Sequence, residues 1–263
     1  MINLREKSAN HERIICAAVS IVIFLCLWQV IAVYTKVSIF LPGPIEVLRA
    51  FFISFVKPIG ENRITGHTFW SLSRVLTGFF IGSSLGIIAG ILMGLYKPVN
   101  YFIWPLFELI RPIPAIAWIP LSIVWFGLGE PAKHFLIALS SFCAVTINAY
   151  TGTSSVDEAL IGAAKMLGAN DKQVFATIIL PAAVPQIFAG LQIAIGAAWM
   201  TVVAAEMVRS SEGLGWIVIK GQEVNSMVQI LVGILCIGII GFILATVMRA
   251  IEAKLFIWNE SGK

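Results

Sequence analysis

The chain has 263 residues, of which 59% are hydrophobic and only 12% are charged, and its formal net charge is +4. Soluble domains carry about 25% charged residues, so this composition excludes an ordinary soluble protein. It also excludes a disordered one, because so much apolar surface must be buried. Basic residues beside membrane segments explain the small positive charge better than a nucleic-acid-binding face does. We therefore expect an integral membrane protein with one transmembrane domain over residues 1–263.

Apolar segments of the length needed to cross a membrane recur along the chain, since a bilayer core of about 30 Å requires about 20 helical residues. They predict an all-α fold of about six transmembrane helices. The first segment follows a basic stretch and is too long for the apolar core of a signal peptide, so we expect an uncleaved anchor. The third contains several prolines and is the least regular. The predicted spans are residues 14–34, 75–95, 101–126, 133–150, 187–208 and 227–250.

The connection between the first two spans, residues 35–74, is longer than a tight turn. It contains Leu41-Pro42-Gly43-Pro44, followed by a pattern typical of an amphipathic helix over residues 45–56. Lysine and arginine are almost balanced between the two sides of the predicted topology. Basic residues at both termini favour a cytoplasmic location for both, which an even number of spans permits.

Glycine recurs at every fourth position of the second predicted span. A four-residue step keeps these glycines on one slowly drifting stripe of a helix, and small residues let a neighbouring helix approach closely inside a membrane. We expect a packing seam, and the alternative is a smooth surface along which a helix slides during gating. The glycines are Gly78, Gly82, Gly86, Gly90 and Gly94.

The segment between the fourth and fifth spans, residues 157–181, predicts a helix–turn–helix. An acidic residue, Asp157 or Glu158, suits the start of the first helix, and Gly168 suits its left-handed end. Asn170 or Asp171 can cap a second short helix, which we expect Pro181 to close. The first helix carries a small apolar stripe that needs a protein partner or the ends of the spans to cover it: Ala159, Leu160, Ala163, Ala164 and Leu167.

Residues 162–181 resemble the EAA loop of the permease subunits of bacterial ABC importers, whose pattern is EAA-x3-G-x9-I-x-LP. Every position after the first matches in residue and spacing, whereas Gly162 replaces the leading glutamate. Other stretches are similar to the nitrate, sulfonate, taurine and bicarbonate branch of that family: Leu41-Pro42-Gly43-Pro44, Arg111-Pro112-Ile113-Pro114, Trp125-Phe126-Gly127-Leu128-Gly129-Glu130 and Gly213-Leu214-Gly215-Trp216.

The resemblance implies a multi-pass permease of the bacterial cytoplasmic membrane with both termini inside. It would be one of two copies, or one of a pair with a related permease, above two ATP-binding subunits and below an extracytoplasmic solute-binding protein. Alternating access would import a small anionic solute, with ATP bound by the partner subunits and no cofactor in this chain. The residues expected to couple to the ATPases are Glu158, Ala159, Ala163, Ala164, Leu167, Gly168, Ile178, Leu180 and Pro181.

Motifs for chemistry in this chain itself are absent from the sequence. It has no GxxxxGK[ST] phosphate loop and no HExxH, so we expect neither ATP hydrolysis nor another enzymatic activity of its own. The four cysteines lie in apolar runs without a CxxC pair, which indicates packing residues rather than a metal site. The alternative function is an ion-gradient-driven secondary transporter, which would need acidic residues within its spans.

Charged residues inside a span are candidates for function because an unpaired charge in hydrocarbon is costly. Glu108 and Arg111 lie one turn apart and can pair, or Arg111 faces the pathway and attracts an anion. Glu206 either ties helices together or meets substrate. Broken helices are tolerated where they line a cavity, so we expect the proline-rich part of the third span in the pathway wall. The candidate pathway residues are Arg111, Pro112, Pro114, Trp118, Gln192, Trp199 and Glu206.

Overall fold

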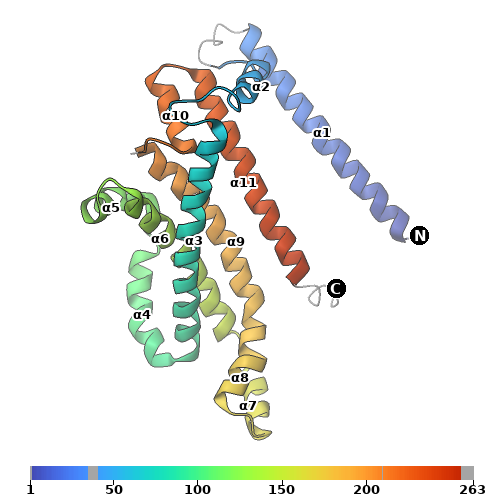
Figure 1. Ribbon diagram of the computed structural model, residues 1–263. Coiled ribbons are helices and arrows are strands. Elements are labelled where there is room, and N and C mark those ends of the chain that lie inside the picture. Colours follow the sequence, from blue (N-terminus) through green and yellow to red (C-terminus); the bar gives the residue numbers. More distant parts are fainter. Residues whose placement is uncertain (1, 35–40, 209, 256–263) are drawn as a thin grey trace. The chain divides into compact units, whose positions relative to one another are not determined.

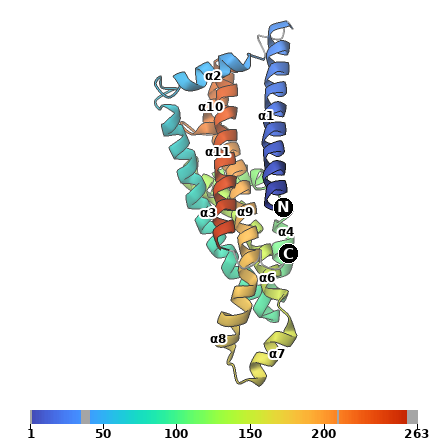
Figure 2. The ribbon, with the colours of Figure 1, turned by 90° about the vertical axis from the view of Figure 1, so that its right-hand side faces the viewer.

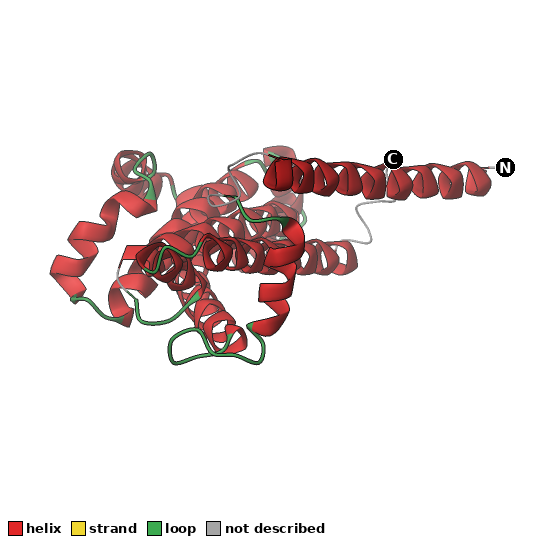
Figure 3. Cartoon of the chain, turned by 90° about the horizontal axis from the view of Figure 1, so that it is seen from above, coloured by secondary structure: helices red, strands yellow, loops and turns green. Residues whose placement is uncertain are grey.

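The computed structural model describes residues 2–34, 41–208 and 210–255, with side chains from residue 15 onwards. Within these ranges the regular elements are helices, apart from an isolated bridge between Ile59 and Asn62, as Figure 3 shows. Five of the described helices are long and apolar enough to cross a membrane, and a bent helix pair makes a sixth span if it counts as one. The expected all-α fold with about six spans is therefore confirmed.

The described chain forms two compact units, Met1–Ile64 with Ile217–Leu235, and Thr65–Trp216 with Cys236–Lys263. The first unit contains α1 (Ile2–Tyr34) and α2 (Pro44–Ile53), together with most of α10 (Leu214–Glu223) and the first part of α11 (Met227–Leu255). In this unit α2 lies across the end of α1 (Figure 2). Trp28 Nε1 donates a hydrogen bond of 3.1 Å to the carbonyl oxygen of Pro42, which ties α1 to the segment just before α2.

The second unit holds the remaining helices. They are α3 (Ile64–Leu95), α4 (Lys97–Ile110), the 3-10 helix η1 (Ala115–Trp118), α5 (Ile119–Phe126), α6 (Glu130–Ser154), α7 (Glu158–Met166), α8 (Asp171–Val174), the π-helical η2 (Phe175–Ile179), α9 (Leu180–Val208) and the rest of α11.

Helix α3 begins eleven residues before the predicted second span, at Ile64 instead of residue 75. The prediction was wrong because it began the span after Arg74, on the assumption that a charge marks a span end. In the structure Arg74 is buried inside the helix, where acidic partners compensate its charge. The helix predicted over residues 45–56 is shorter than expected and ends at Ile53.

The third span is broken into two limbs. The first limb is α4, the second is η1 with α5, and the two are bent by 85°, as Figure 1 shows. Pro112 and Pro114 lie at this break, where proline cannot supply the N–H groups that a continuous helix needs. Gly127 ends the second limb with a φ of 77°, a backbone conformation that favours glycine.

The glycine stripe of α3 packs directly against α6. A Cβ atom on Gly82 would collide with the carbonyl group of Ala138, and one on Gly90 would come within 2.5 Å of the carbonyl oxygen of Thr146. A Cβ atom on Gly94 would come within 2.6 Å of the Cβ atom of Thr153. The predicted packing seam is therefore confirmed over almost the whole length of α6, whereas sliding along it stays a prediction.

An adjoining face of α6 packs against α9, and Ala149 contacts both α3 and α9. A Cβ atom on Gly152 would come within 3.0 Å of the carbonyl oxygen of Ala183, and one on Gly190 within 2.6 Å of the Asn148 side chain. Ala149, Ala183 and Ile187 form a buried apolar cluster between the two helices. Helices α3, α6 and α9 thus make a closely packed core, which Figure 1 shows side by side.

Candidate functional site

The segment from Asp157 to Pro181, named the coupling segment after the role that the resemblance implies for it, projects beyond the ends of α6 and α9 (Figure 2). Asp157 caps α7 by accepting a hydrogen bond of 2.8 Å from the backbone N–H of Ala159. Asn170 and Gln173 form a reciprocal capping box at the start of α8. Gly168 lies between α7 and α8 with a φ of 88°. The predicted caps and left-handed glycine are confirmed.

Apolar side chains cover the tip of the coupling segment and face solvent. None of the residues of α7 is buried, and Met166 and Leu167 are 86% and 90% exposed. Glu158, Ala159, Ala163, Gly168 and Pro181 are exposed too, whereas Ala164, Ile178 and Leu180 are half-buried. An apolar tip of this kind is typical of a protein contact surface.

The second half of the coupling segment differs from its prediction. Pro181 does not close a short helix, because α8 continues through η2 into α9 and the run from Asp171 to Val208 is one helical span. The π-helical turn Phe175–Ile179 ends two residues before Pro181. Such a turn replaces i to i+4 bonding locally, so the missing N–H of the proline can be accommodated without ending the helix.

The candidate pathway residues of the third span lie at its bend. Arg111 and Glu108 form an ion pair of 3.3 Å and are both more than a third exposed, which confirms the predicted pairing. Pro112 and Pro114 are exposed at the bend, and Trp118 is half-buried. The Nε1 atom of Trp118 is itself buried and makes no hydrogen bond.

Two further candidates lie on α9 and contact α11. Trp199 is buried, and its Nε1 donates a hydrogen bond of 3.1 Å to the carbonyl oxygen of Ile237. Gln192 Nε2 donates one of 2.7 Å to a carboxylate oxygen of Glu252. Both side chains therefore connect helices within this unit.

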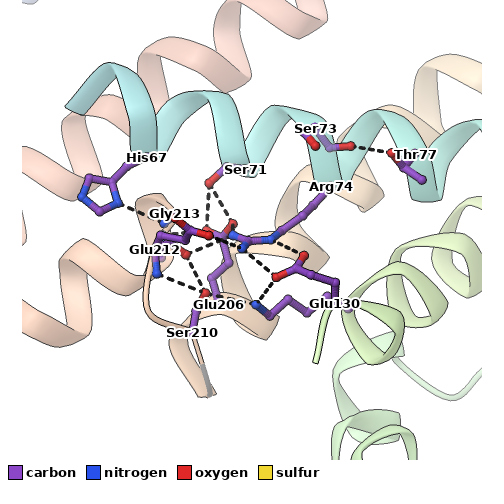
Figure 4. A network of polar contacts seen from close by, with 12 residues as sticks. His67, Ser71, Ser73, Arg74, Thr77, Glu130, Glu206, Ser210, Glu212 and Gly213 are labelled. Carbon is purple, nitrogen blue, oxygen red and sulfur yellow. Dashed lines mark hydrogen bonds and ion pairs between the residues drawn. The ribbon is translucent and has the colours of Figure 1, made fainter. Parts of the chain in front are cut away.

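Glu206, near the end of α9, is only 1% exposed, and it ties helices together (Figure 4). Arg74 Nη1 donates to its Oε1 at 2.8 Å, and the Ser71 hydroxyl donates to the same carboxylate at 2.9 Å. The backbone N–H of Gly215 donates to Oε2 at 3.0 Å. Of the two roles left open for Glu206, the structure favours the structural one.

Arg74 is the centre of this arrangement and is also 1% exposed. Its Nε and Nη2 bind both carboxylate oxygens of Glu130 at 2.7 and 2.8 Å, in the bidentate geometry that suits a guanidinium. Nη1 also donates to the carbonyl oxygen of Glu212 at 3.0 Å. Lys133 donates to Glu130 at 2.9 Å and to the Ser210 hydroxyl at 3.1 Å. We call these groups the charge network: His67, Ser71, Arg74, Glu130, Lys133, Glu206, Ser210 and Glu212.

The charge network also caps the start of α10. The N–H of Gly213 donates to His67 Nδ1 at 3.1 Å, and the N–H of Leu214 donates to the Ser71 hydroxyl at 2.9 Å. Because the first N–H groups of a helix lack partners within it, side chains from α3 and α9 take the place of a local cap. Gly213 has a φ of 116°, and a Cβ there would collide with the Glu206 carboxylate. This is why glycine stands at that position.

Most of the charge network was not predicted from the sequence, in which Glu108, Arg111 and Glu206 are the expected charges within spans. Arg74 lies at the end of the predicted connection 35–74, Lys133 at the first position of the predicted fourth span, and Glu130 in one of the motifs of the resemblance. An earlier start of the second span would have placed Arg74 in a helix. Its partners could not be deduced, because they come from segments 56 and 132 positions further along the chain. Within the described residues no group of three or more His, Cys, Asp or Glu side chains is arranged to hold a metal ion.

Comparison with known proteins agrees with this architecture. A family model for the binding-protein-dependent transport system inner membrane component matches residues 82–257. A putative ABC transporter permease protein of Methanocaldococcus jannaschii is 38% identical over 90% of this chain and 89% of its own length. The taurine transport system permease protein TauC of Escherichia coli (strain K12) is 37% identical over 91% of this chain and 88% of its own length.

The fold also matches a solved structure. The crystal structure of an amino acid ABC transporter with histidines contains a chain that superposes with a TM-score of 0.61 at 17% identity, covering 79% of this chain and 95% of that one. At this identity the likeness shows the fold. Together with the family model and the sequence relatives, it shows that the chain belongs to the binding-protein-dependent transport system inner membrane components, the permeases of ABC importers.

Proposed function

We propose that this permease imports a small anionic solute by alternating access, driven by ATP that separate subunits bind and hydrolyse. The assembly would contain two copies of this chain, or one copy and a related permease. Two ATP-binding subunits and an extracytoplasmic solute-binding protein would complete it, in a bacterial cytoplasmic membrane with both termini of this chain inside. The observation that carries the proposal is the solvent-exposed apolar tip of the coupling segment.

The coupling segment has the properties of a docking element. Its caps, its left-handed glycine and the 2.9 Å ion pair between Lys165 and Asp171 hold its shape from within. Met166 and Leu167 are therefore free to enter a cleft on another protein. Glu158, Ala159, Ala163 and Ala164 would line the same contact, Gly168 would supply the turn, and Ile178, Leu180 and Pro181 would pass the motion into α9.

The anionic class of solute is supported by chemistry at the bend of the third span. Arg111 is 43% exposed there, with one acidic neighbour, and the relative TauC is named for taurine, a sulfonate. Pro112, Pro114 and Trp118 adjoin it. Sulfonates, taurine, nitrate and bicarbonate share the delocalised negative oxygens that a guanidinium binds well. Gln192, Trp199 and Glu206 would shape the pathway indirectly, through the helix contacts they make.

The test is purification of the tagged permease in mild detergent, with identification of its partners, followed by reconstitution in liposomes. We expect an ATPase subunit at one copy per permease, and ATP hydrolysis that rises when solute-loaded binding protein is added. A Leu167→Asp variant should lose this rise and retain its thermal stability, because the side chain is exposed. Leu255→Asp, at an exposed apolar position outside the coupling segment, is the control.

A permease that purifies alone, and moves solute in liposomes on an ion gradient, would overturn the proposal in favour of a secondary transporter. Such a transporter would need a carboxylate that is free to exchange ions. Glu206 is held by Arg74, Ser71 and Gly215, and Glu108 is paired with Arg111.

A further inference from the structure

The charge network and the second limb of the bent third span use neighbouring positions on the same two helices. Ile119 of this limb packs with Leu136 of α6 and Ala205 of α9 in a buried cluster. Leu136 follows Lys133 by about one helical turn, and Ala205 directly precedes Glu206. The residues of α6 and α9 that contact the second limb therefore lie on the same helical turns as those of the charge network.

Helix α9 connects the residues that contact the second limb to the coupling segment. The helical run continues from Asp171 to Val208, so no loop separates the coupling segment from the far end of α9. At 1.5 Å per residue, the distance along the axis from Leu180 to Glu206 is about 39 Å. Movement of the coupling segment along this axis therefore moves Ala205 and Glu206 as well.

The end of the second limb also contacts α6 directly, because the rings of Trp125 and Phe126 lie 5.9 and 5.1 Å from that of Phe135, whereas its outer face is free. Val124 and Trp125 are 79% and 56% exposed, and the limb ends at Gly127, where a Cβ would meet nothing within 4 Å. The chain next enters α6 at Glu130, whose carboxylate is clamped by Arg74 and Lys133. The charge network thus fixes the start of α6 where the chain leaves the limb, in addition to the aromatic contacts with Phe135.

We propose that Arg74 is a positioning residue for transport: it holds Glu130 and Glu206 together, so that the second limb of the third span moves with α9. Displacement of the coupling segment then reaches the bend that carries Arg111. The inference rests on the proposed function and deepens it. It requires arginine at this position, because one rigid guanidinium binds Glu130 through two nitrogens and Glu206 through the third. A lysine ammonium cannot reproduce that geometry.

Spin labels on the two ends of this connection test the proposal. Val124→Cys places one label on the limb, and Lys172→Cys places the other in the exposed part of the coupling segment. Cys16, Cys26, Cys143 and Cys236 are replaced by alanine. Distances between the two copies of each label are measured by pulsed electron paramagnetic resonance in the complete transporter in nanodiscs, before and after trapping with ATP and vanadate.

In the otherwise native chain we expect both label distances to change on trapping. In Glu130→Gln the change at position 172 should persist, whereas the change at position 124 should fall at least threefold, since the amide cannot hold the guanidinium and the ammonium as the carboxylate does. Glu130 is partly exposed, so this variant is the mildest break in the network. Arg74→Lys should likewise retain the change at position 172 and reduce the change at position 124. It should also lower the solute imported per ATP at least tenfold. The matched control is Glu223→Gln, which removes an exposed carboxylate paired with Lys220.

A response at position 124 that survives in both Glu130→Gln and Arg74→Lys would overturn the proposal. Loss of both responses in these variants would overturn it as well, because the network would then act on assembly rather than on the limb. Absence of any change at position 172 in the native chain would instead contradict the proposed function, so the two failures are distinguishable.

Discussion

The coupling segment and the charge network are built in opposite ways. Polar contacts in the coupling segment join residues two to six positions apart, such as Asp157 with Ala159 and Lys165 with Asp171, and its side chains are mostly exposed. The charge network has Arg74 and Glu206 buried at its centre, and it joins positions as far apart as His67 and Gly213, 146 residues along the chain. The coupling segment can therefore change its exposed side chains without losing its shape. The charge network loses its compensation when Arg74 or Glu206 is removed, because a buried charge without its partner is costly.

Removal of Arg74 is the most severe way to break the network. Arg74→Met should destabilise the protein by about 3–5 kcal/mol, because it leaves the carboxylates of Glu130 and Glu206 without their main counter-charge. We expect little folded protein, measured as the monodisperse yield on size-exclusion chromatography in detergent. The same substitution at exposed Arg249 should leave the yield unchanged. Equal yields for the two variants would contradict the assignment of Arg74 as the centre of the network.

The glycine seam of α3 should also be sensitive to substitution, with a smaller loss of stability than in the charge network. Gly82→Ala should lower stability by about 1–3 kcal/mol, because its methyl group meets the backbone of Ala138, which cannot move as a flexible side chain could. Gly196→Ala is the control, since a Cβ there meets nothing within 4 Å. The thermal unfolding midpoints of the two variants measure the difference, and the seam assignment fails if they coincide.

In the coupling segment, loss of a cap should act locally. Asp157→Ala should cost about 1 kcal/mol of helix stability, because it leaves the N–H of Ala159 without its acceptor. Hydrogen exchange should accelerate over α7 and stay unchanged in α6. Faster exchange that spreads into α6 would show that the segment is less independent than its contacts indicate.

The smallest effect is expected at the half-exposed ion pair of the third span. Glu108→Gln should change the unfolding free energy by less than about 0.5 kcal/mol, because exposed pairs contribute little. If Arg111 attracts the solute, the same variant should raise the transport affinity for an anion, measured as a lower half-saturating concentration of loaded binding protein. A large loss of stability would place this pair with the charge network instead.

The sequence predicts the parts of this fold that depend on near neighbours. The span count, the caps at Asp157 and Asn170 and the left-handed Gly168 were predicted correctly from composition, spacing and conformational preference. The glycine seam was predictable too, although its partner helix was not. Arg74, Glu130 and Lys133 were missed, because charge was taken as the mark of a span end. A charge can be buried when distant segments compensate it, and a single sequence does not show which segments meet.

The end of the helix before Pro181 was wrong for a related reason. Proline usually interrupts a helix, but the π-helical turn before it lets the helix continue into α9. Just after this turn, Ala183 and Ile187 of α9 pack against Ala149 of α6 in a buried cluster. The consequence is large, since a break there would have separated the coupling segment from the far end of α9.

The wide spacing of the charge network sets an order of events during synthesis. Arg74 leaves the ribosome 56 residues before Glu130 and 132 residues before Glu206. At about 5–20 residues per second, the second interval lasts about 7–26 s. Of the three carboxylates that pair with Arg74, Glu130 is therefore synthesised first, and Glu206 arrives only when α9 is almost complete. A nascent chain that stalls between these two residues holds Arg74 with one of its three acidic partners.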